Sequence, residues 1–443
     1  MGQKNMKQTG QKWDVIIIGA GAAGMMAACT AAARGAKVLL LEKNEKTGKK
    51  IYITGKGRCN FTNACETEDF FANVPRNANF LYSSVYGFDS SMAIDWFEDR
   101  GVRTKVERGM RAFPVSDHAS DITRCLEREM KRLGVELRLN SEVKELLFEN
   151  LPGKSETAES DPGDANAYVL RTVRGVCLAD ETKISARRVI VATGGLSYPS
   201  TGSTGDGYRF AREAGHAVSR LSPSLVPFNA KEEDVFLLQG LSLKNVAFTI
   251  LSGKRKLFRE TGEMMFTHFG VTGPLVLRAS AKVQDSIEKG ELKAEIDLKP
   301  ALAEEKLDAR ILREFDENRN RSLRNAVRSL YPSKMIPVII KRTGIDPDRP
   351  VHDVTAAERR ELIRKTKHFE LTLTSLRGFN EAVITRGGVS VRQIDPATME
   401  SRLVKGLHFA GEVLDVDALT GGFNLQIAWS TGHAAGEGCS TKK

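Results

Sequence analysis

The sequence predicts an α/β protein with a parallel sheet, into which a second, β-rich domain is inserted. Three observations support this prediction. Residues 15–41 begin the chain with a buried strand, a glycine-rich turn, a helix and a second strand. The middle of the chain changes to alternating apolar residues and then to charged helical patterns. Near the C-terminus an apolar strand ends in glycine and is followed by a helix, so the last segment can return to the first domain.

The first unit carries the glycine motif of a dinucleotide-binding turn. Gly19 permits a tight turn, Gly21 lets backbone approach a pyrophosphate, and Gly24 lets the following helix lie close to the strand. Ala22 and Ala23 open that helix, whose N-terminus offers free N–H groups and a partial positive charge to phosphates.

An acidic residue follows the second strand of the same unit. Glu42 comes directly after residues 37–41, and its carboxylate can accept hydrogen bonds from a ribose diol. The turn, helix, second strand and acid all fall at the spacing of a dinucleotide-binding unit. We therefore interpret the motif as a nucleotide site rather than as a glycine-rich structural turn.

The composition is that of an ordinary globular protein with two or three domains. The chain has 443 residues, of which 41% are apolar and 28% are charged. Residues 15–33 carry no charge, but glycines at turn spacing favour a strand and a helix over a membrane span. The polar, basic residues 1–13 do not resemble a signal peptide, so a cytoplasmic protein without a membrane partner is expected.

The net charge of +10 comes from 66 basic and 56 acidic residues, and residues 310–328 are rich in arginine. No compact nucleic-acid motif accompanies them, and aromatic residues are not interleaved with the basic ones. We therefore predict a solvated basic surface, a small-molecule substrate and no stable nucleic-acid partner. The sequence carries no pattern that specifies an oligomeric state.

Six cysteines, at positions 29, 59, 65, 125, 177 and 439, are scattered without metal-ligand spacing, so no metal site is predicted. Cys59 and Cys65 lie where some flavin disulfide reductases carry a redox pair. Those pairs have four intervening residues, whereas five separate Cys59 from Cys65 here. Two unrelated thiols are the favoured interpretation.

Periodicity and turn residues predict the remaining elements. Residues 43–63 are rich in Gly, Lys, Thr and Asn and predict a long functional loop, and residues 150–167 predict a mobile hairpin tip. Predicted helices are 91–100, 117–133, 206–214, 301–341 and 424–435, and predicted strands are 135–139, 142–148, 168–173, 175–178, 183–186, 188–192, 246–251, 292–298, 369–373 and 406–412.

Three strand ends that carry glycine stand far apart in the sequence, at 19–24, 192–195 and 411–422. Ligands of doubly wound α/β folds collect at the carboxyl ends of parallel strands. We therefore expect these three ends to meet at one ligand, although the glycines at 421–422 could also form a plain helix-entry turn.

These segments carry a family resemblance. The N-terminal motif, Ala192-Thr193-Gly194 and Phe409-Ala410-Gly411-Glu412 together resemble the two-dinucleotide-binding-domain flavoproteins related to glutathione reductase. Segments 55–63, 201–207, 411–415 and 421–426 more narrowly resemble the BaiN-like NAD(P)/FAD-dependent oxidoreductases, over nearly the whole chain.

The resemblance implies a discontinuous Rossmann-like FAD-binding domain, a parallel sheet plus a β-meander, at 1–203 and 376–443. The inserted domain would span 204–375, β-rich at about 218–300 and 350–375, with a helical subdomain at about 301–345. The implied cofactor-binding residues are Gly19, Gly21, Ala22, Ala23, Gly24, Glu42, Lys43, Lys50, Thr54, Gly55, Gly57, Arg58, Cys59, Asn60, Val143, Ala192, Thr193, Gly194, Gly411, Glu412, Asp415, Gly422, Phe423, Asn424 and Leu425.

Positions within the family imply which part of FAD each segment meets. The N-terminal glycines would hold the pyrophosphate, Glu42 the adenosine ribose and the Val143 backbone the adenine. Segment 54–60 would pass the flavin, and Gly411 with Glu412 would approach the ribityl and phosphate region. A helix that starts near Asn424 would direct its N-terminus at the flavin pyrimidine ring, where its dipole stabilises the charge of reduced flavin.

Several of these residues also have structural interpretations. Arg58 could pair with a carboxylate, Lys56 could be a solvated loop charge, and His268 is favoured as a buried or structural histidine rather than a general acid. Gly205 and Gly207 could shape a helix entry, and Asp206 could cap that helix. No residue is assigned a catalytic role.

The resulting prediction is an FAD-dependent oxidoreductase that transfers hydride through the flavin with NAD(P)H as reductant. Only one dinucleotide motif is present, so a separate NAD(P)H domain is not expected. The family is linked to enone and steroid-like rings, but no residue identifies such a substrate. A flavin-dependent RNA-modifying protein, favoured by the basic balance and the arginine-rich insert, and a non-catalytic flavin-binding protein remain alternatives.

Overall fold

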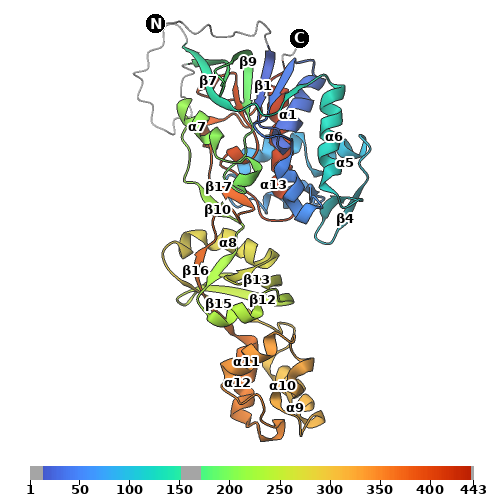
Figure 1. The fold of residues 1–443 in the computed structure, drawn as a ribbon, viewed down its shortest axis with the longest axis vertical. Coiled ribbons are helices and arrows are strands. Elements are labelled where there is room, and N and C mark those ends of the chain that lie inside the picture. The colour runs from blue at the N-terminus through green and yellow to red at the C-terminus, as the bar shows by residue number, and fades with distance from the viewer. Residues whose placement is uncertain (1–12, 151–170, 441–443) are drawn as a thin grey trace. The chain divides into compact units, whose positions relative to one another are not determined.

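The computed structural model describes residues 13–150 and 171–440, so the predicted hairpin tip and residues 1–12 lie outside the described residues. The chain forms two compact units (Figure 1), unit 1 from Met1–Pro223 and Val383–Lys443 and unit 2 from Ser224–Ala382. These boundaries lie later than the predicted 203/204 and 375/376. The reason at the first boundary is α7 (Asp206–Glu213), which buries Tyr208 and Phe210 in the core of unit 1.

Unit 1 is built on a five-stranded parallel sheet in the order β19-β9-β1-β2-β6. Its central strands are continuous apolar runs, as expected for strands that are covered on both faces. The predicted parallel sheet of a Rossmann-like fold is therefore confirmed. The strands are β1 (Trp13–Ile18), β2 (Val38–Leu41), β6 (Glu136–Arg138), β9 (Lys183–Val191) and β19 (Leu407–Phe409).

An antiparallel meander extends this sheet through β7 (Val143–Asn150), β8 (Arg171–Leu178) and the first half of β9. The sequence predicted two short strands in the region of β8 and two more in the region of β9. The structure has a single long strand in each region. Gly175 does not end β8. It lies at a close approach instead, where a Cβ would stand 2.0 Å from the Ile184 carbonyl oxygen.

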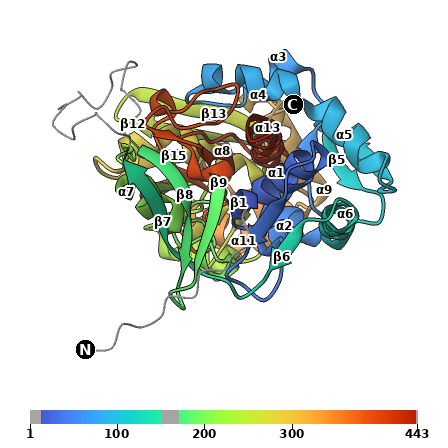
Figure 2. The same cartoon turned by 90° about the horizontal axis from the view of Figure 1, so that it is seen from above.

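Two helices, α1 (Ala22–Ala33) and α13 (Phe423–Gly438), pack against each other beside the sheet (Figure 2). Both are apolar almost all round, because each is covered on most of its faces. A Cβ at Gly432 would lie 2.4 Å from the Ala23 carbonyl oxygen, and one at Gly436 would lie 2.7 Å from that of Ala27. The C-terminal helix therefore approaches the N-terminal helix backbone to backbone.

Most of the other elements of unit 1 are short, with α6 as the exception. The predicted irregular segment 43–63 in fact contains a helix, a 3-10 turn and a strand, which were too short to show periodicity. The elements are α2 (Lys49–Ile53), β3 (Thr62–Asn63), α3 (Thr67–Phe71), α4 (Tyr82–Gly87), α5 (Ser90–Glu98), β4 (Thr104–Glu107), β5 (Arg111–Pro114), α6 (Ala119–Arg132), β17 (Ile384–Arg386) and β18 (Val404–Lys405), with β10 (Ser222–Ser224) at the boundary to unit 2.

Unit 2 contains a closed barrel in the order β11-β14-β13-β12-β15-β16, flanked by α8 (Pro274–Ile287). Alternating side chains fill its interior, including Phe248, Ile296 and Leu371. Its strands are β11 (Phe228–Ala230), β12 (Ser242–Ser252), β13 (Arg255–Phe266), β14 (Gly270–Thr272), β15 (Leu292–Asp297) and β16 (Phe369–Leu376).

Four helices form the rest of unit 2 (Figure 1): α9 (Glu304–Glu317), α10 (Leu323–Ala326), α11 (Met335–Thr343) and α12 (Ala356–Lys367). The sequence placed β structure at about 350–375, but α12 occupies much of that range. Thr355 and Glu358 form a capping box that starts α12. This Thr-x-x-Glu pattern is visible in the sequence and was the missed signal.

The close helix crossing gives a testable consequence for stability. We expect Gly432→Ala to lower the free energy of unfolding by about 2–3 kcal/mol, because the new methyl group must push two backbones apart. The matched control is Gly87→Ala at the end of α4, where a Cβ meets nothing within 4 Å. That control should change stability by less than about 1 kcal/mol. Urea denaturation measures both, and equal effects would contradict the close packing.

Candidate functional site

The turn after β1 presents an open helix N-terminus. Gly19 has φ +101°, and a Cβ on Gly24 would lie 1.9 Å from the Gly19 carbonyl oxygen, so neither position accepts a side chain. Gly21 caps α1 without a side-chain hydrogen bond, and a Cβ there would meet nothing within 4 Å. The first N–H groups of α1, starting with Ala22 and Ala23, therefore have free space before them, which suits a phosphate group.

The second strand end comes from β9 and adjoins this turn. A Cβ on Gly19 would lie 2.6 Å from the Ala192 carbonyl oxygen, so the two segments touch through their backbones. The hydroxyl of Thr193 is buried without a hydrogen-bond partner. Gly194 follows with φ +73°. An unpartnered buried hydroxyl beside an open helix start is consistent with a polar ligand at this place.

The acid after β2 is fixed by backbone contacts. The Glu42 carboxylate accepts hydrogen bonds from the Ala20 amide at 2.7 Å and from the amide and side chain of Asn44 at 2.9 and 2.6 Å. These bonds occupy about three of its roughly four acceptor positions. They hold Glu42 in one orientation and leave it capacity for one further hydroxyl donor.

Lys43 is engaged by a segment far along the chain. Its ammonium lies 2.7 Å from the Asp206 carboxylate and also donates to Thr204. The alternative that Asp206 caps α7 is wrong, because Gly205 is the N-cap and no side chain caps this helix. Gly207 packs closely, since a Cβ there would lie 2.2 Å from the Thr193 hydroxyl. The 201–207 segment thus shapes the region beside the β9 end.

Glu412 joins four segments of unit 1. One of its carboxylate oxygens lies 2.7 Å from the Lys50 ammonium, and the other accepts from the Ser197 hydroxyl at 2.5 Å and the Thr385 amide at 2.9 Å. The side chain is only 11% exposed. Burial alone would raise the pKa of Glu412, but the Lys50 charge and these hydrogen bonds outweigh it and hold the pKa below its ordinary value.

The loop after α2 and the start of α13 lie together. The Asn63 side chain donates to the Gly421 carbonyl at 2.9 Å, and the Thr62 hydroxyl donates to Gln426 at 2.6 Å. A Cβ on Gly422 would lie 2.3 Å from the Thr62 carbonyl oxygen. The two sequence segments that carry the family resemblance most specifically are therefore in direct contact. The Asn60 side chain secures this loop by donating to the carbonyls of Thr62 and Ala112.

The N-terminus of α13 is a second uncapped helix start. Gly422 is its N-cap, with φ +101° and no side-chain hydrogen bond. Asn424 holds the preceding loop by bonding both the amide and the carbonyl of Ala418. Phe423 is buried and Leu425 is half-buried. The first N–H groups of this helix are thus available to an electron-rich ligand.

Two buried carboxylates precede that helix. Arg76 forms an ion pair with Asp415 at 3.2 Å, while one oxygen each of Asp415 and Asp417 has no hydrogen-bond partner. Burial raises the pKa of Asp417 to about 6, against the lowering effect of Arg76 and Arg386. Together with Thr193 and the two open helix starts, these groups form a constellation that fits an extended dinucleotide with phosphates at α1 and an electron-rich ring at α13.

Arg58 is held by carboxylates rather than left available. It donates to Glu107 and, at 2.7–2.9 Å, to Asp117, and Lys105 joins the same cluster. Hydrogen bonds from Arg58 hold the pKa of Glu107 below its ordinary value, and bonds from Lys105 and Arg58 do the same for Asp117. Arg58 therefore pairs with carboxylates, which is the structural interpretation that the sequence left open.

The thiols near this loop show no redox pairing. All six cysteines are free, and Cys59 is completely buried. Burial strongly raises the pKa of the Cys59 thiol, and burial also raises that of Cys65. Neither thiol has the low pKa of a reactive cysteine, which agrees with the interpretation as two unrelated thiols.

The remaining sequence candidates are distributed as follows. Lys56 is exposed and has no ion-pair partner among the residues that the structure describes, as expected for a solvated charge. His268 was expected to be buried or structural, but it is exposed in unit 2 beside Phe269, because the short connection between β13 and β14 ends at the surface. Thr54 donates to the Lys50 carbonyl, and Val143 is buried at the start of β7. Gly55 and Gly57 have positive φ angles.

Sequence reasoning missed three residues of the constellation. Ser197 and Thr385 bind Glu412, and Asp417 carries the raised pKa. Asp417 could have been found, because it stands two residues after Asp415 in the same segment. Thr385 had no signal, since it reaches the site only through tertiary contacts.

The parallel sheet, the glycine turn and the second open helix start define a Rossmann-type dinucleotide-binding protein. The model of the HI0933-like protein Rossmann domain matches residues 13–438. The chain therefore belongs to the HI0933-like family, which confirms the family resemblance of the sequence, and it is an FAD-dependent oxidoreductase. No helix within residues 13–150 and 171–440 has the length and apolar character needed to cross a bilayer.

Characterised relatives cover nearly the whole chain. The 3-dehydro-bile acid delta(4,6)-reductase of Clostridium scindens is 32% identical over 96% of this chain and 98% of its own. The ribosomal RNA dihydrouridine synthase of Haemophilus influenzae is 33% identical over 95% of this chain and 96% of its own. The enzyme of the same name from Escherichia coli is 30% identical over 96% of this chain and 98% of its own.

Solved flavoenzyme structures share the fold. The 3-ketosteroid delta1-dehydrogenase from Sterolibacterium denitrificans aligns with a TM-score of 0.52 at 13% identity, over 98% of this chain and 100% of that chain. The 3-ketosteroid-delta4-(5alpha)-dehydrogenase from Rhodococcus jostii aligns with a TM-score of 0.50 at 16% identity, over 99% of both chains. At these identities the likeness establishes the fold alone.

The buried ion pair of the site predicts a pH-dependent loss of stability. Lys50→Met removes the cation that keeps Glu412 ionised, and we expect a loss of about 2–4 kcal/mol near pH 7. The loss should shrink toward about pH 4, because a carboxyl with a lowered folded-state pKa gives its stabilisation above its unfolded pKa and loses it as pH falls. Urea denaturation at both pH values measures this.

The control for that experiment is Lys49→Met. Lys49 pairs with the exposed Glu45 at 2.9 Å. This surface pair should contribute little to stability, because solvent and salt screen it. Equal losses in the two variants at both pH values would show that the Glu412 contact does not act as a buried ion pair.

The open space over Gly21 predicts a selective effect on the cofactor. Gly21 has an extended backbone, φ −84° and ψ −168°, which any residue can adopt. We expect Gly21→Val to weaken FAD binding at least about tenfold through steric overlap, while thermal unfolding of the flavin-free protein stays unchanged. Flavin fluorescence titration measures the affinity. Gly378→Val, where a Cβ also meets nothing within 4 Å, should bind FAD normally. Unchanged FAD affinity in Gly21→Val would show that the pyrophosphate does not bind at this turn.

Proposed function

We propose that the enzyme reduces a carbon–carbon double bond conjugated to a carbonyl group in an organic ring, with NAD(P)H as the reductant of its FAD. The observation that carries this proposal is the open N-terminus of α13, where Gly422 is the N-cap and no side chain caps the first N–H groups. A helix N-terminus at the flavin ring favours the reduced, negatively charged flavin. When it is bound, FAD supplies hydride transfer through its flavin ring.

The names of the relatives support the type of bond. One is a delta(4,6)-reductase of a 3-dehydro-bile acid, and two form dihydrouridine, which is uridine with a saturated pyrimidine double bond. In each case a ring double bond conjugated to a carbonyl group becomes saturated. Conjugation lowers the barrier for hydride addition, because the carbonyl oxygen takes up the developing negative charge.

Within this proposal, the chain's own residues bind and orient FAD. The first N–H groups of α1 hold the pyrophosphate, and Glu42 accepts from the ribose. Glu412 and Lys50 fix the backbone around the β19 end, so Gly411 can lie close to the cofactor. Unit 1 is then the FAD-binding domain, and unit 2 the substrate-side domain.

NAD(P)H is proposed to act as a transient reductant. Among the glycine-rich segments only 19–24 has the full dinucleotide motif, so the nicotinamide cofactor would not have a second motif of its own. It would reach the flavin, reduce it and leave before the organic substrate is reduced.

A second candidate substrate is a uracil ring within RNA. Two relatives that align over 95–96% of this chain carry the name ribosomal RNA dihydrouridine synthase. Residues 301–367 contain 16 Lys and Arg against 11 Asp and Glu, so they contribute half of the chain's net charge of +10. A positive surface of this kind attracts a polyanion. The reaction at the ring would be the same in kind.

One experiment tests the reaction and separates the substrates. NADH and NADPH are added without oxygen to the FAD-loaded protein, and the loss of the flavin's visible absorption is followed. We expect at least one of them to bleach the flavin. Cyclic enones, quinones and ribosomal RNA are then offered to the reduced protein, and reoxidation is followed together with the saturated product.

The outcomes of that experiment separate the candidates. Reoxidation by an enone with a saturated product supports the small-molecule substrate, and dihydrouridine in the RNA supports the second candidate. A flavin that neither nicotinamide nucleotide bleaches would contradict the proposed reductant. A flavin that is bleached but reoxidised by none of these acceptors would contradict the proposed reaction.

A further inference from the structure

The helical part of unit 2 contains a stretch with charge of one sign. Residues 318–345 contain seven basic residues and no Asp or Glu. Such a concentration repels itself in a folded unit unless counter-charges or a ligand offset it. The seven residues are Arg319, Arg321, Arg324, Arg328, Lys334, Lys341 and Arg342.

Only part of this charge is neutralised within the protein. Arg342 forms a bidentate pair with Asp234 at 2.6–2.7 Å, and Arg324 pairs with Asp348. Arg328 and Lys341 are exposed and have no acidic partner among the residues that the structure describes. Arg319, Arg321 and Lys334 have no acidic partner among these residues either, so five of the seven cations have no internal counter-charge, and Arg328 and Lys341 are the two of them that line a common cavity.

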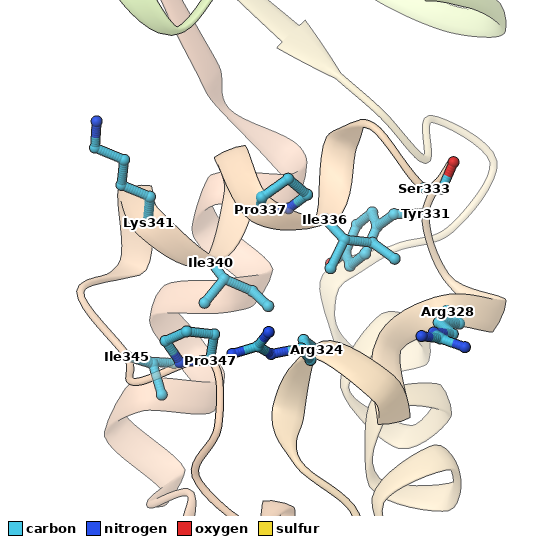
Figure 3. Close-up of a pocket in the computed structure, with 10 residues that line it drawn as sticks. All are labelled: Arg324, Arg328, Tyr331, Ser333, Ile336, Pro337, Ile340, Lys341, Ile345 and Pro347. Atoms are coloured by element: carbon cyan, nitrogen blue, oxygen red, sulfur yellow. The ribbon is translucent and has the colours of Figure 1, made fainter. Parts of the chain in front are cut away.

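Both cations line one pocket (Figure 3), a cavity of about 740 Å³ formed by α10, α11 and the segments that follow them. Its size lies within the range of roughly 300–1,000 Å³ that is typical of ligand pockets. The lining residues are Arg324, Arg328, Tyr331, Ser333, Ile336, Pro337, Ile340, Lys341, Ile345 and Pro347. All of them belong to unit 2.

The pocket combines an apolar floor with a cationic rim. Ile336 and Ile340 are buried and present apolar surface, and Pro337 continues it. Figure 3 shows Arg324 with its guanidinium directed toward Ile340 and Pro347, while Arg328 lies on the other side of the pocket. A flat ring can lie on such aliphatic and guanidinium surfaces, and the rim can bind its attached anion.

We propose that this pocket binds a short stretch of single-stranded RNA, with one phosphate at Arg328, another at Lys341 on the opposite side of the pocket (Figure 3), and a base between them against Ile336, Pro337 and Arg324. The proposal rests on the RNA candidate above and gives it a docking site in unit 2. An acidic peptide would use the cations but not the floor, and an apolar ligand would use the floor but not the cations. A nucleotide uses both, none of the ten lining residues is acidic, and the neighbouring Asp348 is paired with Arg324.

The test measures binding of a fluorescein-labelled single-stranded RNA of about 20 nucleotides to the FAD-loaded full chain at several salt concentrations. We expect Arg328→Ala combined with Lys341→Ala to weaken binding at least about tenfold. The slope of log affinity against log salt should fall by about 1.4, or about 0.7 for each lost phosphate contact. Ser333→Glu, which places a carboxylate at the rim of the pocket, should weaken binding as well.

The matched control is Arg313→Ala combined with Arg360→Ala. Both side chains are exposed on the same helical part, have no ion-pair partner among the described residues and do not line the pocket. The control removes the same charge and should weaken binding less than about threefold. If both double variants weaken RNA binding equally, the proposed binding site in the pocket is wrong and the effect is one of overall charge.

Flavin reduction by NAD(P)H, measured in the same samples, separates the proposals. Wild-type protein that is reduced normally but binds no RNA overturns both the pocket and the RNA candidate, and leaves the proposed ring reduction standing with a small substrate. Wild-type protein that binds RNA through the pocket but is not reduced supports the pocket and contradicts the proposed reductant.

Discussion

The candidate site depends on backbones that approach each other where no side chain fits. The ends of β1, β9 and β19 meet because glycines stand at their crossings. A Cβ on Gly19 would collide with Ala192, and one on Gly411 would lie 2.8 Å from the Cβ of Ala23. Gly432 plays the same part between α1 and α13. This constraint brings the two ends of the chain together and leaves two helix N-termini open toward the site.

Charged and polar contacts then hold these closely packed segments in place. Glu412 is buried and ionised, because Lys50, Ser197 and Thr385 bind it from three other segments. A buried charge holds its partners in place, because moving one of them would leave the charge buried and unpaired. Asp417 shows the opposite case, because its burial outweighs the nearby arginines and raises its pKa to about 6. The two carboxylates thus differ in the direction of their pKa shifts, although they stand five residues apart in one segment.

The two units have different roles in the proposed function. Unit 1 holds the features that suit a dinucleotide, and they come from both ends of the chain. Unit 2 holds a barrel and a helical part whose residues 318–345 are basic without a single acid. A small ring substrate and a uracil in RNA need the same hydride chemistry, but only RNA needs a cationic docking surface. Under the proposal, the helical part is therefore the region where RNA and a small substrate would be treated differently.

The sequence by itself determined the parallel sheet and the family, because the glycine turn and apolar strands are local patterns with a fixed period. It missed α12, although its Thr355–Glu358 capping box was visible, and it could not show that β8 continues through Gly175. Only the tertiary structure decided that Arg58 is held by Glu107 and Asp117 and that Thr385 reaches Glu412. The physical reason is that these contacts join residues far apart in sequence, and their partners are chosen by packing rather than by local pattern.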